Sequence, residues 1–408
     1  MIRWKKVWAD LWKNKTRTFL AALSIAVGVF AVGLVVSSFV IVKQDMERDY
    51  QAINPHTFQI FCQDFDQDML HGLANTPGVT AVEARYNLWI KIAGADGKEY
   101  PINLNSIGPL DEMQVDKLVY QQGATSLGYR EIYLERQGAE DLGVEPGDNV
   151  DLILNTGKIR TLKVAGTVHD VIANPFKFTS STAGFVTPKT MEWLGGSSQF
   201  NFVTVSTSGP QTDIPYIRTI AEKVADKIER TGHRVLNINI NNPGQHPAQS
   251  IINTVQMLMS ALGVMSVLLS VFLIINTTTA LMGQQIRHIG VMKAIGATAF
   301  QLIGMYLTLV LAFGLLALLI AIPLAGLAAS ALTRWLVGML NANPSPFFIP
   351  PVSIWLQVGI ALGVPMVAAL FPVLGGARLT IRQAISDYGL RARGSRTLFD
   401  RLLETIRG

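Results

Sequence analysis

The chain has 408 residues, of which 49% are hydrophobic and only 15% are charged, and its mean hydropathy is +0.32. A soluble domain of average composition carries about 25% charged residues, so this composition excludes a protein that is soluble over its whole length. The net charge of +5 does not indicate a nucleic-acid partner, because the Lys and Arg residues flank apolar segments, where anionic lipid headgroups attract them.

Four segments lack Asp, Glu, Lys and Arg, and each contains an apolar run long enough to cross a bilayer as a helix, which takes about 20 residues. These segments lie between residues 17 and 43, 234 and 287, 293 and 334, and 334 and 378. A polar block, residues 43–234, separates the first from the second. The pattern predicts a membrane α-helical protein with four transmembrane helices and an extracytoplasmic mixed α+β domain inserted between helices 1 and 2.

The first 17 residues are predicted to form a cytoplasmic amphipathic elbow helix on the membrane surface. Trp4, Trp8 and Trp12 recur on one face at helical spacing, and Lys15 and Arg17 follow just before the first span. Tryptophan at the headgroup level with cations beside it is typical of such a helix. The apolar run at 18–42 is too long for the core of a secretory signal, so it is predicted to be a retained span.

Residues 18–50 are predicted to form transmembrane helix 1 and a charged helical stalk, and residues 51–249 the extracytoplasmic domain. Residues 214–231 have the apolar periodicity of a helix. A subdomain is expected at about 131–187, and 239–247 is expected to be a linker to the membrane. Strands are predicted at 57–62, 79–92, 131–134, 149–154, 160–168 and 202–206.

The remainder of the chain is divided by its apolar runs. It comprises transmembrane helix 2 (250–282), a cytoplasmic coupling segment (283–300), transmembrane helix 3 (301–340), an external loop (341–351), transmembrane helix 4 (352–374) and a cytoplasmic tail (375–408). The third run is longer than a bilayer requires. It is therefore expected to tilt, to extend beyond the bilayer or to bend at Pro323.

The distribution of charge predicts the orientation. Residues 1–17 hold six Lys or Arg and one acid, the tail from Arg378 holds seven Arg and three acids, and the polar block holds 18 bases and 25 acids. Short segments rich in Lys and Arg stay in the cytoplasm. The protein is thus predicted to be multi-pass in the cell (inner or plasma) membrane, with both termini cytoplasmic and residues about 43–250 outside.

No catalytic residue and no metal site are predicted. The sequence has no phosphate-binding G-x-x-x-x-G-K-[ST] loop and no G-x-S-x-G elbow, and its six histidines are scattered. The single cysteine, Cys62, is expected to be a small buried residue. The apolar segments hold no ionisable side chains of the kind that ion-coupled carriers need, so a secondary transporter is disfavoured.

Three segments of the sequence resemble the MacB/FtsX-type permeases of ABC transporters. Residues 11–29 resemble the elbow, the N-K-x-R turn and the first span of that family. Residues 285–298, QIRHIGVMKAIGAT, resemble its E-R-x-R-E-I-G-x-x-[KR]-A-[LI]-G-A-x segment, although His288 replaces the usual Glu. Residues 372–385 are similar to its tail, and the polar block, especially 131–170, is similar to its MacB-like periplasmic core domain.

The resemblance implies the permease subunit of an ABC transporter of the mechanotransmission class, which exports or extracts a peptide, drug, lipid or lipoprotein. It implies a separate ABC ATPase subunit that holds ATP and Mg, with no cofactor bound by this chain and no ATPase domain fused to it. A second permease copy or paralogue, membrane lipids and a periplasmic adaptor or hydrolase are the other implied partners.

The segment between spans 2 and 3 is the candidate ATPase-coupling site. It combines apolar anchors with cations and with glycines that allow close approach, as does a helix that docks into a groove on a partner. The alternative is a basic loop that only sets topology. The candidate residues are Ile286, Arg287, Ile289, Gly290, Met292, Lys293 and Gly296.

Two other functions remain open from the sequence. An FtsX-like transmembrane regulator would activate an extracytoplasmic cell-wall hydrolase without transport, and it would have the same four spans and outer domain. A receptor without an ATPase would leave the coupling segment unexplained. A hydrolase gene next to the gene of this chain would favour regulation, and a gene for a periplasmic adaptor there would favour export.

Overall fold

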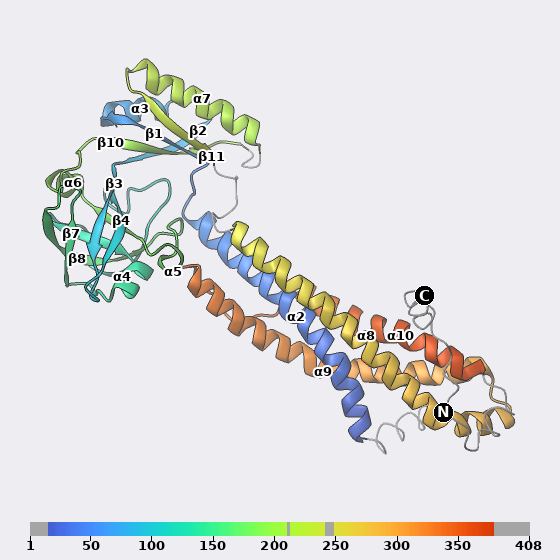
Figure 1. Ribbon diagram of the computed structural model, residues 1–408. Coiled ribbons are helices and arrows are strands. Elements are labelled where there is room, and N and C mark those ends of the chain that lie inside the picture. Colours follow the sequence, from blue (N-terminus) through green and yellow to red (C-terminus); the bar gives the residue numbers. More distant parts are fainter. Residues whose placement is uncertain (1–14, 210–212, 241–248, 379–408) are drawn as a thin grey trace, which may run out of the picture. The chain divides into compact units, whose positions relative to one another are not determined.

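The computed structural model describes residues 15–209, 213–240 and 249–378. In this part of the chain four helices are long and apolar enough to cross a membrane (Figure 1): α2 (Lys15–Ala52), α8 (Gln249–Ala294), α9 (Ala299–Met339) and α10 (Pro351–Arg378). An α+β domain follows α2 and precedes α8 in the chain, which confirms the predicted fold class. The predicted elbow residues Trp4, Trp8 and Trp12 lie outside the described residues.

The described residues form two compact units. The first comprises 15–37, 259–329 and 349–378, and the second comprises 38–258 and 330–348. The second unit therefore contains the inserted domain together with one end each of α2, α8 and α9. The long α9 contains Pro323 and continues as a helix through it to Met339.

Small residues allow the helices of the first unit to approach closely. A Cβ atom added to Gly314 on α9 would lie 2.4 Å from the carbonyl oxygen of Ala361 on α10. Ala317 and Ala321, one and two turns further along α9, are fully buried in the same apolar cluster. Close contact of this kind holds membrane helices together, because lipid provides no hydrophobic force between them.

A polar cluster pairs α2 with α10 in the first unit. Ser37 Oγ donates to Ser353 Oγ at 2.8 Å, and Gln357 Nε2 donates to the same oxygen at 3.1 Å. Ser353 Oγ in turn donates to the carbonyl of Gly33 at 3.3 Å. Ser37, Ser353 and Gln357 are all fully buried, so these bonds form away from solvent, where a polar side chain needs a partner.

The inserted domain begins and ends in a four-stranded antiparallel sheet of order β11-β1-β10-β2. Its strands are β1 (Phe58–Phe65), β2 (Val79–Arg85), β10 (Phe200–Thr207) and β11 (Val235–Ile240), and its helices are α3 (Gln67–Ala74) and α7 (Ile214–Arg230). Apolar residues on one face of α7, among them Ile217 and Val224, pack on Phe58 and Ile60 of β1. The helical periodicity of the sequence thus forms one side of this core.

The second sheet is mixed and has the order β5-β8-β6-β9-β4-β3-β7. Because β7 also pairs with β8, six of its strands close into a barrel. The strands are β3 (Asn87–Ala93), β4 (Glu99–Ser106), β5 (Val119–Gly123), β6 (Glu131–Glu135), β7 (Asn149–Ile153), β8 (Ile159–His169) and β9 (Thr182–Val186). The helices α4 (Arg136–Leu142) and α5 (Phe176–Thr179) lie between strands of this sheet, and α6 (Pro188–Trp193) leads from β9 to β10 of the first sheet.

Three boundaries differ from those predicted. The apolar run at 79–92 is two strands, because the chain passes from the first sheet to the second between Arg85 and Asn87. The expected subdomain at 131–187 is part of a larger sheet, since β4 pairs in parallel with β9 and brings in residues from 87 onward. The expected linker at 239–247 begins inside β11, whose Asn239 and Ile240 pair with β1.

Candidate functional site

The predicted coupling segment is the end of a long helix and not a separate element, because α8 runs without a break from Gln249 to Ala294. Gly296, with φ of +99°, follows this end. The N–H of Ala297 donates to the carbonyl of Met292 at 2.9 Å, and that of Gly296 donates to Lys293 at 3.0 Å. This is a Schellman motif, in which glycine adopts the left-handed conformation without steric strain.

The end of α8 packs on the two helices that follow it. Met292 contacts an apolar cluster that includes Tyr306 of α9 and Val373 of α10, and Gly290 is buried. Lys293 is half-buried. A displacement of this segment would therefore be passed to α9 and α10, because closely packed side chains deform little.

The remaining predicted residues are placed by their backbone. Ile286, Arg287 and Ile289 lie in α8, but their side chains are outside the described part of the structure. Lys15 is exposed in the first turn of α2, and Arg17 follows it in the same helix. The structure therefore describes Gly290, Met292, Lys293 and Gly296 of the coupling site in full.

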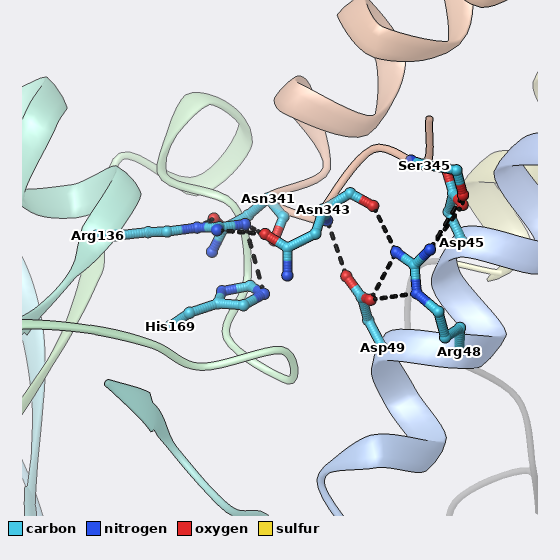
Figure 2. Close-up of polar contacts among 8 residues, drawn as sticks. All are labelled: Asp45, Arg48, Asp49, Arg136, His169, Asn341, Asn343 and Ser345. Atoms are coloured by element: carbon cyan, nitrogen blue, oxygen red, sulfur yellow. Dashed lines mark hydrogen bonds and ion pairs between the residues drawn. The ribbon is translucent and has the colours of Figure 1, made fainter. Parts of the chain in front are cut away.

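A second site, which the sequence did not reveal, lies within the second unit. Here the loop after α9 meets the end of α2 and the inserted domain (Figure 2). We call this site the stalk junction and define it by Asp45, Arg48, Asp49, Glu135, Arg136, His169, Asn341, Asn343 and Ser345.

The α2 side of the stalk junction is a pair of buried carboxylates. Asp49 accepts the backbone N–H of Asn343 at 2.8 Å, and Asp45 accepts that of Ser345 at 3.0 Å as well as the Ser345 hydroxyl. Arg48 lies between them and donates to Asp49 at 3.0 Å and to the carbonyl of Asn343 at 2.8 Å. Because these three residues are spaced i, i+3 and i+4, one face of α2 holds Asn343 and Ser345 of the loop.

The domain side of the stalk junction is Arg136, the first residue of α4. Its guanidinium donates to Asn341 Oδ1 at 2.9 Å, to the Asn341 carbonyl at 3.0 Å and to Asn343 Oδ1 at 2.6 Å. Next to it, Glu135 accepts the side-chain amide of Asn341 at 2.6 Å. A planar guanidinium with several donors can hold a loop in one orientation in this way, which an ammonium cannot do.

Local conformation presents these groups to one another. Asn341, with φ of +57°, follows the end of α9, and the N–H of Ala342 donates to the carbonyl of Val337 at 2.9 Å. Asparagine is one of the few side chains that tolerate this conformation. On the other side, the second oxygen of Glu135 caps α4 by accepting the N–H of Gln137 at 2.8 Å.

The charged groups of the stalk junction are partly buried, with the carboxylates buried and the Arg136 guanidinium half-buried. Burial lowers the pKa of the Arg136 guanidinium, and the carboxylates of Glu135 and Asp49 oppose this shift. His169 is fully buried, and its Nε2 lies 3.4 Å from Arg136 Nη2, which can donate to it. Its Nδ1 lies 3.6 Å from a carboxylate oxygen of Glu135.

The contacts of the stalk junction attach parts of the chain to one another. Within the described residues no group of three or more His, Cys, Asp or Glu side chains could hold a metal ion. Next to the polar network, Val42 and Met46 of α2 pack on Val337 and Leu340 of α9. The stalk junction thus fastens the ends of two long helices to one edge of the inserted domain.

Fold and junction together define a polytopic membrane protein whose inserted domain is attached directly to the ends of its long helices. Residues 260–381 match the family model described as FtsX-like permease C-terminal. This part of the chain therefore resembles the C-terminal domain of FtsX-like permeases, which confirms the resemblance predicted from the sequence. A search of curated protein sequences gives no match to the chain.

Three solved structures are similar to this chain over about half of its length. The extracellular domain of the noncanonic ABC-type transporter YknZ from Gram-positive bacteria has 17% identity and a TM-score of 0.32, with 44% of this chain and 99% of that chain covered. The periplasmic region of MacB from Actinobacillus actinomycetemcomitans has 16% identity and a TM-score of 0.32, with 52% and 97% covered. A domain of a putative permease protein from Porphyromonas gingivalis has 14% identity and a TM-score of 0.29, with 48% and 96% covered.

Proposed function

We propose that this chain is the permease subunit of an ABC transporter of the mechanotransmission class. The observation that carries the proposal is the stalk junction, which fastens the loop after α9 to both α2 and the inserted domain. The match to FtsX-like permeases and the packing of the coupling segment on α9 and α10 support it. A separate cytosolic ATPase would bind ATP and Mg, and this chain would bind neither. The chain would convert closure of that ATPase into motion of the inserted domain.

The helices provide a continuous path for such motion. Movement at Gly290–Lys293 would displace α9, with which Met292 is in contact. That helix is unbroken to Met339, and the stalk junction fastens the loop after it to Arg136 of the inserted domain. The substrate would then be moved by the domain and not through the bilayer, which agrees with the absence of Asp, Glu, His, Lys and Arg between 18 and 42 and between 294 and 333.

The orientation and partners follow from the same proposal. The basic termini and the 283–300 segment would face the cytoplasm, where the ATPase is, and residues about 43–250 would face outward. Two permeases, identical or paralogous, would pair in the membrane of the cell. A periplasmic adaptor would accompany export of a peptide, drug, lipid or lipoprotein.

The coupling residues give a direct test. Reversal of charge in the double variant Arg287→Glu/Lys293→Glu should leave membrane insertion intact and abolish association with the ATPase. A matched control is Lys158→Glu, which changes an exposed cation in the turn between β7 and β8. Association is measured by purification from native membranes, crosslinking in cells and mass spectrometry of the partners.

The partners recovered decide between the functions. A stoichiometric ATPase that is lost only in the double variant supports coupling through α8. An ATPase that is retained in the double variant contradicts it. A cell-wall hydrolase in the same sample, without an adaptor, would assign the chain to regulation, and a clean preparation without any ATPase would refute the transporter.

A further inference from the structure

A cleft of about 330 Å³ opens between the two sheets of the inserted domain, apart from the stalk junction. Its walls are formed by β1 and β10 on one side and by β3 and β4 on the other. The residues that line it lie on the faces opposite those that form the two apolar cores. Its volume is at the lower end of the range for small-molecule sites, about 300–1,000 Å³.

The wall formed by β3 and β4 is a row of amides beside an exposed indole. Asn87 and Trp89 alternate with inward-facing residues of β3, and on β4 Asn105 and Asn103 lie opposite them. Asn87 Nδ2 donates to Asn103 Oδ1 at 2.5 Å and to Asn105 Oδ1 at 3.1 Å, which fixes the planes of the three amides. Trp89 is 54% exposed, so a large apolar ring remains open to solvent at the rim.

The opposite wall combines an aromatic pair with a buried arginine. Phe61 and Phe202 stack with their ring centroids 4.7 Å apart. Arg85 is 6% exposed and donates to the carbonyl of Asp116 at 3.0 Å, but its Nε has no hydrogen-bond partner among the described residues. A buried donor without an acceptor is unfavourable, and a ligand oxygen in the cleft would satisfy it.

The charged groups around the cleft disfavour an anionic ligand. The lining holds one guanidinium, of Arg85, and two carboxyl groups, of Asp116 and Asp170; burial raises the pKa of Asp170, while Arg85 opposes that shift. His56 Nδ1 lies 2.8 Å from Asp116 and shares that carboxylate. Because the lining has two carboxyl groups and one guanidinium, an anion gains little by entering, and recognition depends on the neutral amides and the aromatic rings.

The sheet topology disfavours a peptide bound as an added strand. On one wall, β1 lies between β11 and β10 and has no free edge. On the other, β7 pairs with β3 only at Lys91 and Ile92, but the backbone of Asn87 is bonded to the Asn201 side chain and the Trp89 carbonyl to that of Asn155. The edge strand β2 contributes only its last residue, Arg85. Recognition must therefore come from side chains, which here are amides that both donate and accept and flat aromatic rings.

We propose that this cleft binds a neutral carbohydrate of one or two sugar rings, with its hydroxyl groups on the amides of Asn87, Asn103 and Asn105 and one ring face on Trp89. Each sugar hydroxyl donates and accepts, as does each amide. The C–H face of a sugar ring would pack on the exposed indole of Trp89. Arg85 Nε donates to a further hydroxyl oxygen.

Binding is measured on the full chain in lipid nanodiscs, because alkyl-glycoside detergents themselves carry sugars. The probes are maltose, cellobiose and N,N′-diacetylchitobiose, with tetra-alanine as the peptide comparison, and the readout is saturation-transfer NMR. At least one disaccharide should bind. Trp89→Ala should weaken it about tenfold, because the stacking surface is lost. Asn103→Ala should also weaken it, by removing an amide from the row.

Tyr129→Ala is the matched control, since Tyr129 is 56% exposed on the same domain and does not line the cleft. It should leave binding unchanged. Thermal unfolding confirms that each variant is folded. The proposal is overturned if none of the three disaccharides binds at about 10 mM, a concentration that would detect even millimolar affinity. It is also overturned if Trp89→Ala and Tyr129→Ala weaken binding equally, or if tetra-alanine binds in a Trp89-dependent manner. Binding does not require transport, so this test is separate from that of the proposed function.

Discussion

Replacement of Arg136 by alanine should detach the loop after α9 from the inserted domain. The guanidinium makes three hydrogen bonds to Asn341 and Asn343. A hydrogen bond to a charged group contributes about 1.5–3 kcal/mol, but Arg136 is only half-buried and the three bonds share one side chain. We therefore expect a loss of about 3 kcal/mol in the free energy of local opening.

Hydrogen exchange measures this opening directly. The amides of Asn343 and Ser345 are protected by Asp49 and Asp45, and they exchange only when the loop leaves the junction. A loss of about 3 kcal/mol should increase their exchange rates about 100-fold. Arg136→Lys should give an intermediate rate, because an ammonium cannot reproduce the forked contact.

The control is Arg130→Ala. Arg130 stacks on Trp193, with its Cζ 4.5 Å from the ring centroid, and it does not touch the loop. It should leave exchange at Asn343 and Ser345 unchanged. Rates in Arg136→Ala that rise less than about threefold would show that α2 alone holds the loop, and would refute the reasoning.

Three further predictions concern other parts of the chain. Gly314→Ala should destabilise the first unit by about 1–3 kcal/mol in thermal unfolding, because its Cβ would meet the carbonyl of Ala361. Gly304→Ala on the same helix is the control, because its Cβ meets nothing, and it should be neutral or slightly stabilising. Burial raises the pKa of the Cys62 thiol from 9.0 to about 12, so it should resist iodoacetamide at about pH 8.5 until denaturant is added. Burial also raises the pKa of Asp170 above its ordinary value of 3.8, so Asp170→Asn should raise the melting temperature at neutral pH.

The pH dependence of the last two predictions has a definite sign. Folding raises the pKa of both groups. Each therefore contributes to stability at a pH below its unfolded pKa, and this contribution is lost as the pH rises through its folded pKa. The advantage of Asp170→Asn should therefore vanish below about pH 3.8, where Asp170 is neutral folded or unfolded. The Cys62 contribution should decline between about pH 9 and 12 and be absent in Cys62→Ala. An equal gain for Asp170→Asn at all pH values, or rapid alkylation of the native thiol, would contradict these assignments.

The end of α8 near Gly296 could be predicted from the sequence, because its signals are local. Gly296 at the end of an apolar run indicates a helix end, and residues 285–298 follow a family pattern. The stalk junction could not be predicted in the same way. Its sequence signals are weak: three charged residues at helical spacing in the stalk, Asp45, Arg48 and Asp49, and two asparagines in a loop without Lys or Arg. Nothing local indicates which residues they meet.

The sequence by itself determined the four membrane segments, the insertion of an α+β domain after the first of them and the helix at 214–231. Each of these depends on hydrophobicity summed over neighbouring residues, which a linear pattern contains. Only the tertiary structure decided that 79–92 divides between two sheets, that Arg136 bonds Asn341 from 205 positions away, and that an amide row faces a stacked aromatic pair across a cleft. Such contacts depend on strand order and on the closing of long loops, whose partners no local periodicity specifies.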